Sequence, residues 1–248
     1  MITQQALSAY CATLLSVDSF KDYCPNGLQI EGKTEIRKLA TAVTASKAAI
    51  DAATAWGADA LIVHHGFFWR NEPLPLVGQK GVRIRCAMKA DLNVFAYHLP
   101  LDAHPTLGNN AQLAQLLDIE DDGADVARIW RTGLLANPLS LDGFIERIRR
   151  NLRREPQVLL GASKEIKRIA WCTGAAQNYF AQAIDAGVDV FITGEVSESC
   201  YHLARESGVH YIAAGHHATE RYGVQALGAL LAETFALEHQ YIELANPI

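Results

Sequence analysis

An internal repeat constrains the fold of this chain more than any other feature of its sequence. The segment that starts at Glu35, EIRKLATAVTASKAAIDAATAWGADALIVHHG, aligns without a gap with the segment that starts at Glu165, EIKRIAWCTGAAQNYFAQAIDAGVDVFITGEV. Each residue of the first copy therefore matches the residue 130 positions later. A repeat of this length predicts that the chain contains two copies of one structural unit.

Both copies have the same order of predicted elements, which is a buried strand, an alanine-rich helix and a second buried strand. These elements are expected at 39–43, 46–56 and 60–63 in the first copy, and at 169–172, 175–186 and 190–193 in the second. Gly57 and Gly187 follow the two helices, at the position where glycine commonly ends a helix. This order is typical of a βαβ unit with parallel strands.

Each half is extended on both sides of its repeat. A third strand and a further helix are expected at 93–97 and 110–117 in the first half, and at 211–214 and 218–235 in the second. The N-terminal apolar residues recur at helical spacing, and a strand at 128–135 with a helix at 140–152 opens the second half. The acidic segment Glu120–Gly123 is the predicted boundary. We therefore expect an α/β protein of duplicated βαβ-based halves, 1–124 and 125–248, with mixed or parallel sheets flanked by helices.

Composition excludes several classes of protein. With 50% apolar and 20% charged residues, the 248-residue chain has enough apolar side chains for a core and is not disordered. It has no apolar run of the roughly 18–20 residues that a membrane span needs, and its first residues lack the basic segment of a secretory signal. Five widely spaced cysteines predict reduced thiols and a cytoplasmic location. A net charge of −5 argues against sequence-independent binding of nucleic acid.

Histidines and carboxylates follow the predicted strands. His64 and His65 come directly after the strand at 60–63, and His98 and His216 follow the third strands of the two halves. Aligning His98 with His216 also pairs Asp102 with Glu220, and a helix after His216 would place His216 and Glu220 on one face. Ligands of open α/β sheets bind beyond the carboxyl ends of the strands, so these side chains are expected to surround a site.

The predicted metal ligands are three imidazoles and two carboxylates: His64, His65, Asp102, His216 and Glu220. This set suits divalent zinc, manganese, iron, cobalt or nickel, and the sequence does not choose among them. These five ligands can complete the coordination shell of one ion. They can also supply about half of the ligands of two ions, if one carboxylate bridges the ions and water completes the coordination. Open coordination positions are typical of a catalytic site, where paired ions activate a bridging water.

Three further residues are candidates for catalytic roles. His98 and His217 flank the predicted ligands, where they could orient them or act as general acid or base. Glu195 aligns with His65 through the repeat, so it is expected to contact a ligand or the substrate. A hydrogen-bonded strand end is an equally good interpretation of Glu195.

Two further patterns in the sequence have simpler interpretations. The segment Gly27–Thr34 matches the P-loop pattern, but no strand is expected before it and no helix at Lys33, so we discount the match. The arginines between Arg147 and Arg154 lie opposite an apolar helix face that includes Phe144 and Ile148, which is typical of a solvated amphipathic helix. The alternative is a basic cluster that attracts phosphate-bearing substrates.

These motifs resemble those of the Nif-three-like proteins, which are widely labelled type-two GTP cyclohydrolase I homologues and dinuclear metal-binding proteins. The resemblance runs nearly end to end, through the motifs Asn26–Ile30, Val63–Gly66, His98–Asp102, Gly108–Asn110, Thr193–Glu195 with His202, and Gly215–His216 with Thr219–Glu220. It implies a Nif-three-like fold and two metal ions held by the five predicted ligands, with Glu220 bridging. It also implies a homohexameric ring whose sites face an internal cavity.

Two functions follow from these patterns. The first is a dinuclear metal hydrolase that acts on a nucleotide, or on a related phosphate-bearing or purine substrate, through metal-activated water. The cyclohydrolase label itself rests on homology. The alternative is a non-enzymatic protein that binds or transfers metal or regulates a partner. DNA binding through the face formed by Arg147 to Arg154 is a third and weaker hypothesis.

Overall fold

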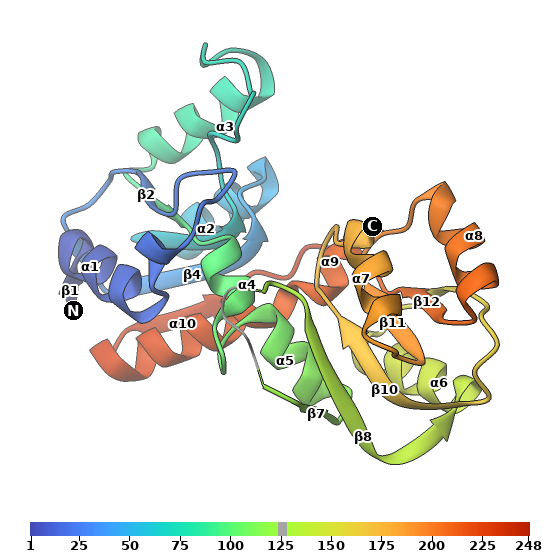
Figure 1. Cartoon of the computed structure of the whole chain (residues 1–248). Helices are drawn as coiled ribbons and strands as arrows, with labels where there is room; N and C mark the ends of the chain where they lie inside the picture. Colours follow the sequence, from blue (N-terminus) through green and yellow to red (C-terminus); the bar gives the residue numbers. More distant parts are fainter. Residues whose placement is uncertain (124–127) are drawn as a thin grey trace. The chain divides into compact units, whose positions relative to one another are not determined.

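The computed structural model describes residues 1–123 and 128–248, which fall into two units that we describe separately (Figure 1). The first unit comprises Met1–Leu101 and Gly223–Ala245, and the second comprises Asp102–Tyr222 and Asn246–Ile248. The predicted boundary between 124 and 125 lies outside the described residues. The strand β7 (Ile119–Asp121) precedes that boundary but belongs to the second unit, because it pairs with β8 (Arg131–Ser140).

The first unit is built around a five-stranded sheet in the order β13-β4-β5-β6-β2. Neighbouring strands from β13 to β6 are parallel, and β2 pairs antiparallel with β6 at one edge. The bounds of these strands are Glu238–Tyr241 for β13, Lys38–Thr44 for β4, Ala60–His65 for β5, Asn93–Ala96 for β6 and Gly27–Ile30 for β2. A short antiparallel pair joins β1 (Ile2–Thr3) to β3 (Glu35–Ile36).

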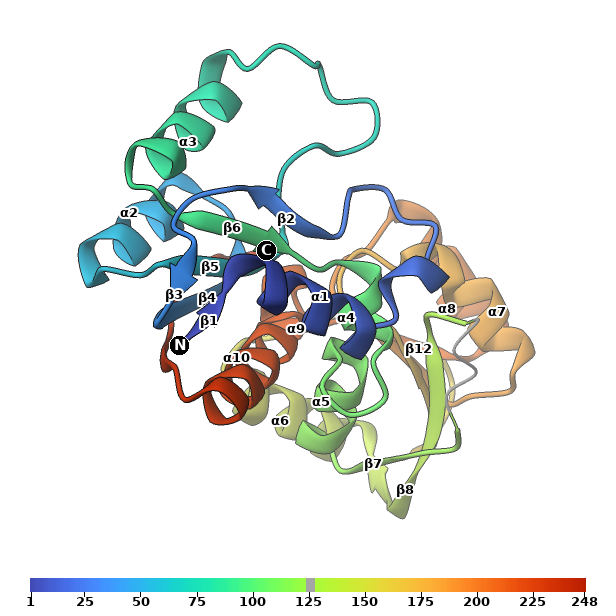
Figure 2. The same ribbon diagram turned by 90° about the vertical axis from the view of Figure 1, so that its left-hand side faces the viewer.

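Helices cover both faces of this sheet. On one face, α2 (Lys47–Trp56) and α3 (Gly78–Lys89) pack against each other and over the apolar side chains of β4, β5 and β6 (Figure 2). On the other face, Gly228 of α10 (Arg221–Phe235) packs closely against Thr41 and His239, where a larger residue would clash. The remaining helical segments of the unit are α1 (Gln4–Leu14), the short η1 (Val17–Ser19) and the first residues of α4 (Leu99–Ala103).

The second unit contains a six-stranded sheet in the order β7-β8-β10-β11-β12-β9. The strands β10, β11 and β12 are parallel, whereas the other pairings in the sheet are antiparallel. Their bounds are Glu165–Trp171 for β10, Val190–Thr193 for β11, His210–Ala213 for β12 and Gln157–Leu159 for β9. Two apolar clusters lie on the sheet, one with α5 (Asn109–Leu116) and α6 (Leu141–Leu152), the other with α7 (Phe180–Asp185) and α8 (Glu198–Ser207).

The predicted α/β fold class is confirmed, and the repeat appears in both units. Each of the two units contains a βαβ motif and a third parallel strand. Each also contains an antiparallel edge strand that precedes the repeat in sequence. That edge strand starts at Gly27 in the first unit and at Gln157 in the second, again 130 residues apart. Outside the repeat, the units differ, because β13 is parallel to β4 whereas β8 is antiparallel to β10.

Two predicted helices differ from those observed. The helix expected at 175–186 begins late, with η2 (Gln177–Tyr179) leading into α7, because Thr193 Oγ1 accepts the Ala176 N–H and donates to the Gly174 carbonyl. The helix expected at 218–235 is two helices, α9 (His216–Thr219) and α10. They are separated at Glu220, whose φ of −109° departs from helical geometry.

Asp59 and Asp189 occupy equivalent positions of the repeat and make the same contacts. Asp59 accepts the backbone N–H groups of Arg37 and Lys38, and Asp189 accepts those of Lys167 and Arg168. Hydrogen bonds to a charged group stabilise a fold by about 1.5–3 kcal/mol. Asp59→Ala and Asp189→Ala are each expected to lower the free energy of unfolding by an amount in that range, which urea titration will measure.

Asp59 also makes a pH-dependent contribution to stability. Burial alone would raise its pKa, but hydrogen bonds from Lys33 and from the two backbone N–H groups lower the pKa below its ordinary value of 3.8. The stabilisation is therefore complete above pH 3.8 and is lost as the pH falls through the lowered pKa. In Asp59→Asn, the loss of stability that comes from protonating Asp59 is expected to disappear. If the free energy of unfolding of this variant falls with decreasing pH as it does in wild type, Asp59 does not make this contribution.

Candidate metal centre

In the first unit, His64 and His65 end β5 with both rings held by hydrogen bonds. The buried His64 donates from Nδ1 to the carbonyl of Tyr97 at 2.9 Å, and His65 Nδ1 lies 3.2 Å from Thr44 Oγ1. A carbonyl can only accept, so Nδ1 of neutral His64 carries the proton and Nε2 carries the lone pair. Gly66 lets the chain pass close to β6 after the pair, since a Cβ there would lie 2.5 Å from the Ala96 Cβ.

His98 lies beside these two rings and is held by a carboxylate that the sequence did not reveal. His98 Nδ1 lies 2.7 Å from Asp22 Oδ1, and the second oxygen of Asp22 accepts from Asn26 Nδ2 and from the Leu99 N–H. Burial alone would raise the pKa of Asp22, but these contacts with His98 and Asn26 and the Tyr23 N–H lower it to about 2. Asp22 is therefore an ionised partner for the His98 N–H.

Two groups of potential metal-binding side chains overlap at His98. One ring nitrogen each of His64, His65 and His98 lies within 4.8 Å of the others. A second group joins His98 to Asp22 and Cys24. Burial and the charge of Asp22 raise the pKa of the Cys24 thiol to about 12, which disfavours the thiolate when no cation is bound. The three imidazoles are the stronger candidates.

In the second unit, His216 lies between two carboxylates. Its Nε2 lies 3.1 Å from Glu220 Oε2, and its Nδ1 lies 2.7 Å from Glu195 Oε1. The predicted proximity of His216 and Glu220 is thus observed, although the helix itself ends at Thr219. Burial alone would lower the pKa of His216, but Glu220 and Glu195 raise it to about 9. The carboxylates favour positive charge here, which a metal cation also supplies.

Asp102 lies close to Glu220 in the same unit. Carboxylate oxygens of the two residues are within 4.8 Å of each other, and both side chains are buried. Asp102 Oδ1 accepts hydrogen bonds from Asn109 Nδ2 at 2.8 Å and from Thr173 Oγ1 at 3.2 Å. Asn110 supports this arrangement, because its side-chain oxygen accepts the Thr173 N–H at 3.0 Å. Two buried carboxylates so close together repel each other, so this position favours a cation.

Gly174 provides the space for the Glu220 carboxylate. Its φ is +68°, and a Cβ at this position would lie 2.1 Å from Glu220 Oε1 and 3.4 Å from His216 Nε2. The sequence showed a glycine in the turn after β10, but only the structure relates it to the predicted ligands.

The remaining histidines have other surroundings. The backbone N–H of His217 donates to the Ile248 carbonyl, and the exposed His202 pairs with Glu198. His104 Nδ1 accepts two backbone N–H groups, and burial followed by the charge of Arg131 lowers the pKa of its ring. Of the candidates for catalysis, His98 and Glu195 thus contact the predicted ligands of their own units.

The P-loop-like segment and the arginine-rich helix agree with their simpler interpretations. The P-loop-like segment forms β2 and an irregular stretch after it, and Lys33 Nζ lies 2.7 Å from Asp59 Oδ1. On α6, Phe144, Ile148 and Leu152 are buried, and Arg149 pairs with Glu146 and Glu155. Ion pairs with neighbouring carboxylates reduce the net positive charge of this helix.

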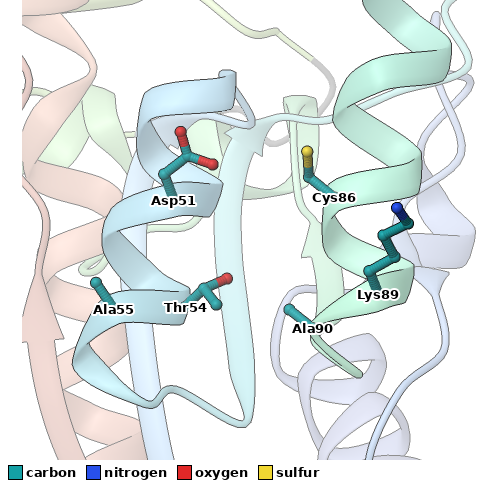
Figure 3. A pocket seen from close by; sticks show the side chains of 6 residues that line it. All are labelled: Asp51, Thr54, Ala55, Cys86, Lys89 and Ala90. Atoms are coloured by element: carbon teal, nitrogen blue, oxygen red, sulfur yellow. The ribbon is translucent and has the colours of Figure 1, made fainter.

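A shallow pocket lies between α2 and α3 in the first unit (Figure 3). Thr54 of α2 and Cys86 of α3 point into the space between the helices, and Asp51 and Lys89 also line it. The six lining residues include none of the predicted metal ligands, so this pocket does not alter the choice of site.

A substitution of Glu195 tests whether this carboxylate orients His216 for metal binding in the second unit. Carboxylates that orient a ligating histidine contribute about 10–100-fold to metal affinity. We expect Glu195→Gln to weaken metal binding by that factor, as measured by equilibrium dialysis with zinc. The matched control is Glu198→Gln, which changes an exposed carboxylate on α8. Equal affinities of the two variants would contradict the orienting role.

Comparison with known proteins identifies the family to which the chain belongs. The model of the family Duf34/NIF3 (NGG1p interacting factor 3) matches residues 2–247. The chain belongs to this family. Curated relatives named GTP cyclohydrolase 1 type 2 homolog include one from Pseudomonas aeruginosa, 50% identical over 237 residues and 94% of each chain. Another, from Neisseria meningitidis serogroup A, is 48% identical over 248 residues and the full length of both chains.

Solved structures of the family share the fold over the whole chain. The structure named "protein ybgI, unknown function" has a TM-score of 0.96 and 43% identity, and covers 100% of both chains. TTHA1606 from Thermus thermophilus has a TM-score of 0.91 and 32% identity, with the same coverage. These relatives confirm the family resemblance and the Nif-three-like fold. Among the described residues, no helix is long and apolar enough to span a bilayer.

Proposed function

We propose that this family member is a dinuclear metal hydrolase. The residues that would hold its two divalent ions, zinc, manganese, iron, cobalt or nickel, are His64, His65, Asp102, His216 and Glu220. One observation supports the proposal most directly: in each of the three predicted histidine ligands, Nδ1 lies within hydrogen-bond distance of an oxygen atom. Histidines that bind metals characteristically have such partners, which fix the ring orientation and leave Nε2 for the ion.

The donor set supports an open, catalytic site. Two divalent ions supply Lewis-acid activation of water and neutralise the charge that develops on an attacked phosphoryl or carbonyl group. Asp102 stays in place through its bonds from Asn109 and Thr173. His98 is held by Asp22 and is a candidate to transfer a proton to or from the substrate.

The proposed substrate is a nucleotide or a related phosphate-bearing or purine compound. The names of the curated relatives, GTP cyclohydrolase 1 type 2 homolog, support this class. We further propose a homohexamer, as the family resemblance implies, and a cytoplasmic location, with which the free thiols agree. Light scattering measures the assembly directly.

The experiment that tests this function combines metal analysis with a substrate screen. Purified protein is expected to contain two divalent ions per chain and to hydrolyse at least one compound of a nucleotide and phosphoester panel. Protein stripped by a chelator is the control, and activity must return when metal is restored. Metal binding without turnover on any substrate would contradict the hydrolase and favour the non-enzymatic alternative, a metal-binding, metal-transfer or regulatory protein.

A further inference from the structure

Two aromatic side chains lie beside His98 in the first unit, and neither is among the residues proposed to hold metal. Tyr23 comes from the loop before β2, and Trp69 comes from the loop after β5. We propose that Tyr23 and Trp69 form a stacking site for an aromatic base of the substrate. The inference rests on the proposed function, because it takes the chemistry to occur next to these rings, but binding of the base is measured without turnover.

The ring of Trp69 contacts two histidines without lying flat on either. Its centroid is 5.9 Å from that of His65, with 51° between the ring planes, and 5.0 Å from that of His98, with 86° between the planes. His65 is a predicted metal ligand, and His98 is a candidate for proton transfer. The indole is only partly buried. A planar ligand that stacks on Trp69 would therefore lie next to the residues proposed for the chemistry.

Tyr23 is the more exposed of the two aromatic residues. It is 54% exposed, and its ring centroid lies 6.4 Å from that of His98. The guanidinium carbon of Arg70 lies 5.6 Å from the centroid of the Tyr23 ring, in a cation–π contact. Aromatic rings and arginine planes are the side-chain groups on which nucleobases stack. Tyr23, Trp69 and Arg70 are therefore a group of the type that binds a base.

Hydrogen bonds join the two loops that carry these rings. The backbone N–H of Arg70 donates to the Tyr23 carbonyl at 2.7 Å, and Arg70 Nη2 donates to the Asp22 carbonyl at 3.0 Å. Within the second loop, the Trp69 N–H donates to Glu72 Oε2 at 3.3 Å, and the Glu72 N–H donates to the Trp69 carbonyl at 3.0 Å. Both loops are thus held before a ligand binds, which lowers the entropic cost of binding.

The backbone on both sides of Trp69 is in the left-handed region. The angle φ is +66° at Phe68 and +72° at Asn71. Asparagine adopts this conformation readily, whereas a phenylalanine there is an outlier. Burial of its own ring does not explain the conformation, because Phe68 is 37% exposed. Such conformations cluster at ligand-binding sites, where the surroundings impose them. The backbone of this loop therefore supports a binding role for Trp69.

The exposed aromatic surface favours a planar ligand. Tyr23 and Phe68 are both among the exposed large apolar residues, and grouped apolar surface in water is typical of a binding site. A nucleobase covers such a surface by stacking, because every base has a π face. The site is therefore expected to recognise a heterocyclic ring, and to distinguish nucleotides from phosphate esters that lack a base.

The test compares two ligands that share a sugar phosphate and differ in the base. Guanosine monophosphate and ribose phosphate are titrated into the metal-loaded full chain in a calorimeter. We expect Trp69→Ala to weaken the binding of guanosine monophosphate by about 5–150-fold, as for the loss of one stacking partner, and to leave the binding of ribose phosphate unchanged. Tyr23→Ala is expected to weaken the binding of the nucleotide alone, by about fivefold or more.

Two further variants separate stacking from other effects. Trp69→Phe keeps an aromatic ring and is expected to retain most of the affinity for guanosine monophosphate. Tyr201→Ala is the matched control for Tyr23→Ala, because Tyr201 is 52% exposed and lies on α8 of the second unit. It is expected to bind both ligands as wild type does. The metal content of Trp69→Ala is measured as well and is expected to equal that of wild type.

The inference is overturned if wild type binds guanosine monophosphate no more tightly than ribose phosphate, or if Trp69→Ala weakens both ligands alike. Loss of metal from Trp69→Ala would also overturn it, since the indole would then support the histidines rather than a ligand. Failure of the proposed function gives a different result. A protein that binds the nucleotide through Trp69 but hydrolyses nothing has the stacking site and is not a hydrolase.

Discussion

The His64→Ala protein is expected to keep its fold, bind metal at least about 100-fold more weakly and lose its hydrolytic turnover. Residues that only orient a ligand contribute about 10–100-fold to metal affinity, so removal of a ligand itself must cost at least the upper part of that range. His64 is buried at the end of β5, where its Nδ1 hydrogen bond to the Tyr97 carbonyl fixes the ring. Metal content after dialysis and turnover on the best substrate of the panel measure the two losses.

The fold must be monitored together with binding, because the substitution also removes a buried side chain. Thermal unfolding of the metal-free protein compares His64→Ala with wild type in the absence of the ion. His202→Ala is the control, since that histidine is exposed on α8 and pairs with the exposed Glu198. If His64→Ala binds metal as tightly as wild type, the proposed ligand set is wrong.

Gly174→Ala is expected to abolish tight metal binding by the second unit, with a loss of affinity of at least about 100-fold. The new Cβ would lie 2.1 Å from Glu220 Oε1, so the carboxylate must leave its place beside His216. The backbone contributes a separate effect. At a φ of +68° an alanine is strained, and we expect about 1–2 kcal/mol of lost stability.

Gly187→Ala separates these two effects. Gly187 has the same φ of +68°, but no atom lies within 4 Å of the position that a Cβ would occupy. The same strain is therefore expected without displacement of a ligand. Urea unfolding should show similar losses of stability for both variants, while zinc titration should show weakened binding for Gly174→Ala alone. Equal metal affinities would refute the role assigned to Gly174.

The strands around the repeat were predictable because each has a distinct chemical pattern. Runs such as Val190–Thr193 are apolar on both faces, as strands covered by helices on both sides must be, and the observed strand has the predicted bounds. The secondary-structure prediction failed where contacts with residues distant in sequence override the local pattern. The single helix expected at 218–235 breaks at Glu220, which no local propensity required.

Two elements outside the repeat, α3 and β13, received no prediction. The helix α3 lacks a strong apolar period, and only three of its residues, Gly81, Ile84 and Ala87, are buried. The edge strand β13 is polar, with the sequence EHQY, and its pairing with β4 joins segments about 200 residues apart. Such pairings depend on the assembled sheet rather than on the pattern of the strand itself.

The candidate ligands themselves were determined by the sequence, because imidazoles and carboxylates that gather at the ends of repeated strands are typical of a metal site. The residues that hold them were decided only by the tertiary structure. Asp22 reaches His98 across 76 positions, and Gly174 makes room for a carboxylate 46 positions away. An aspartate or a glycine in a loop has many possible roles. Its role at a metal site follows only when folding brings its atoms within bonding distance of a ligand.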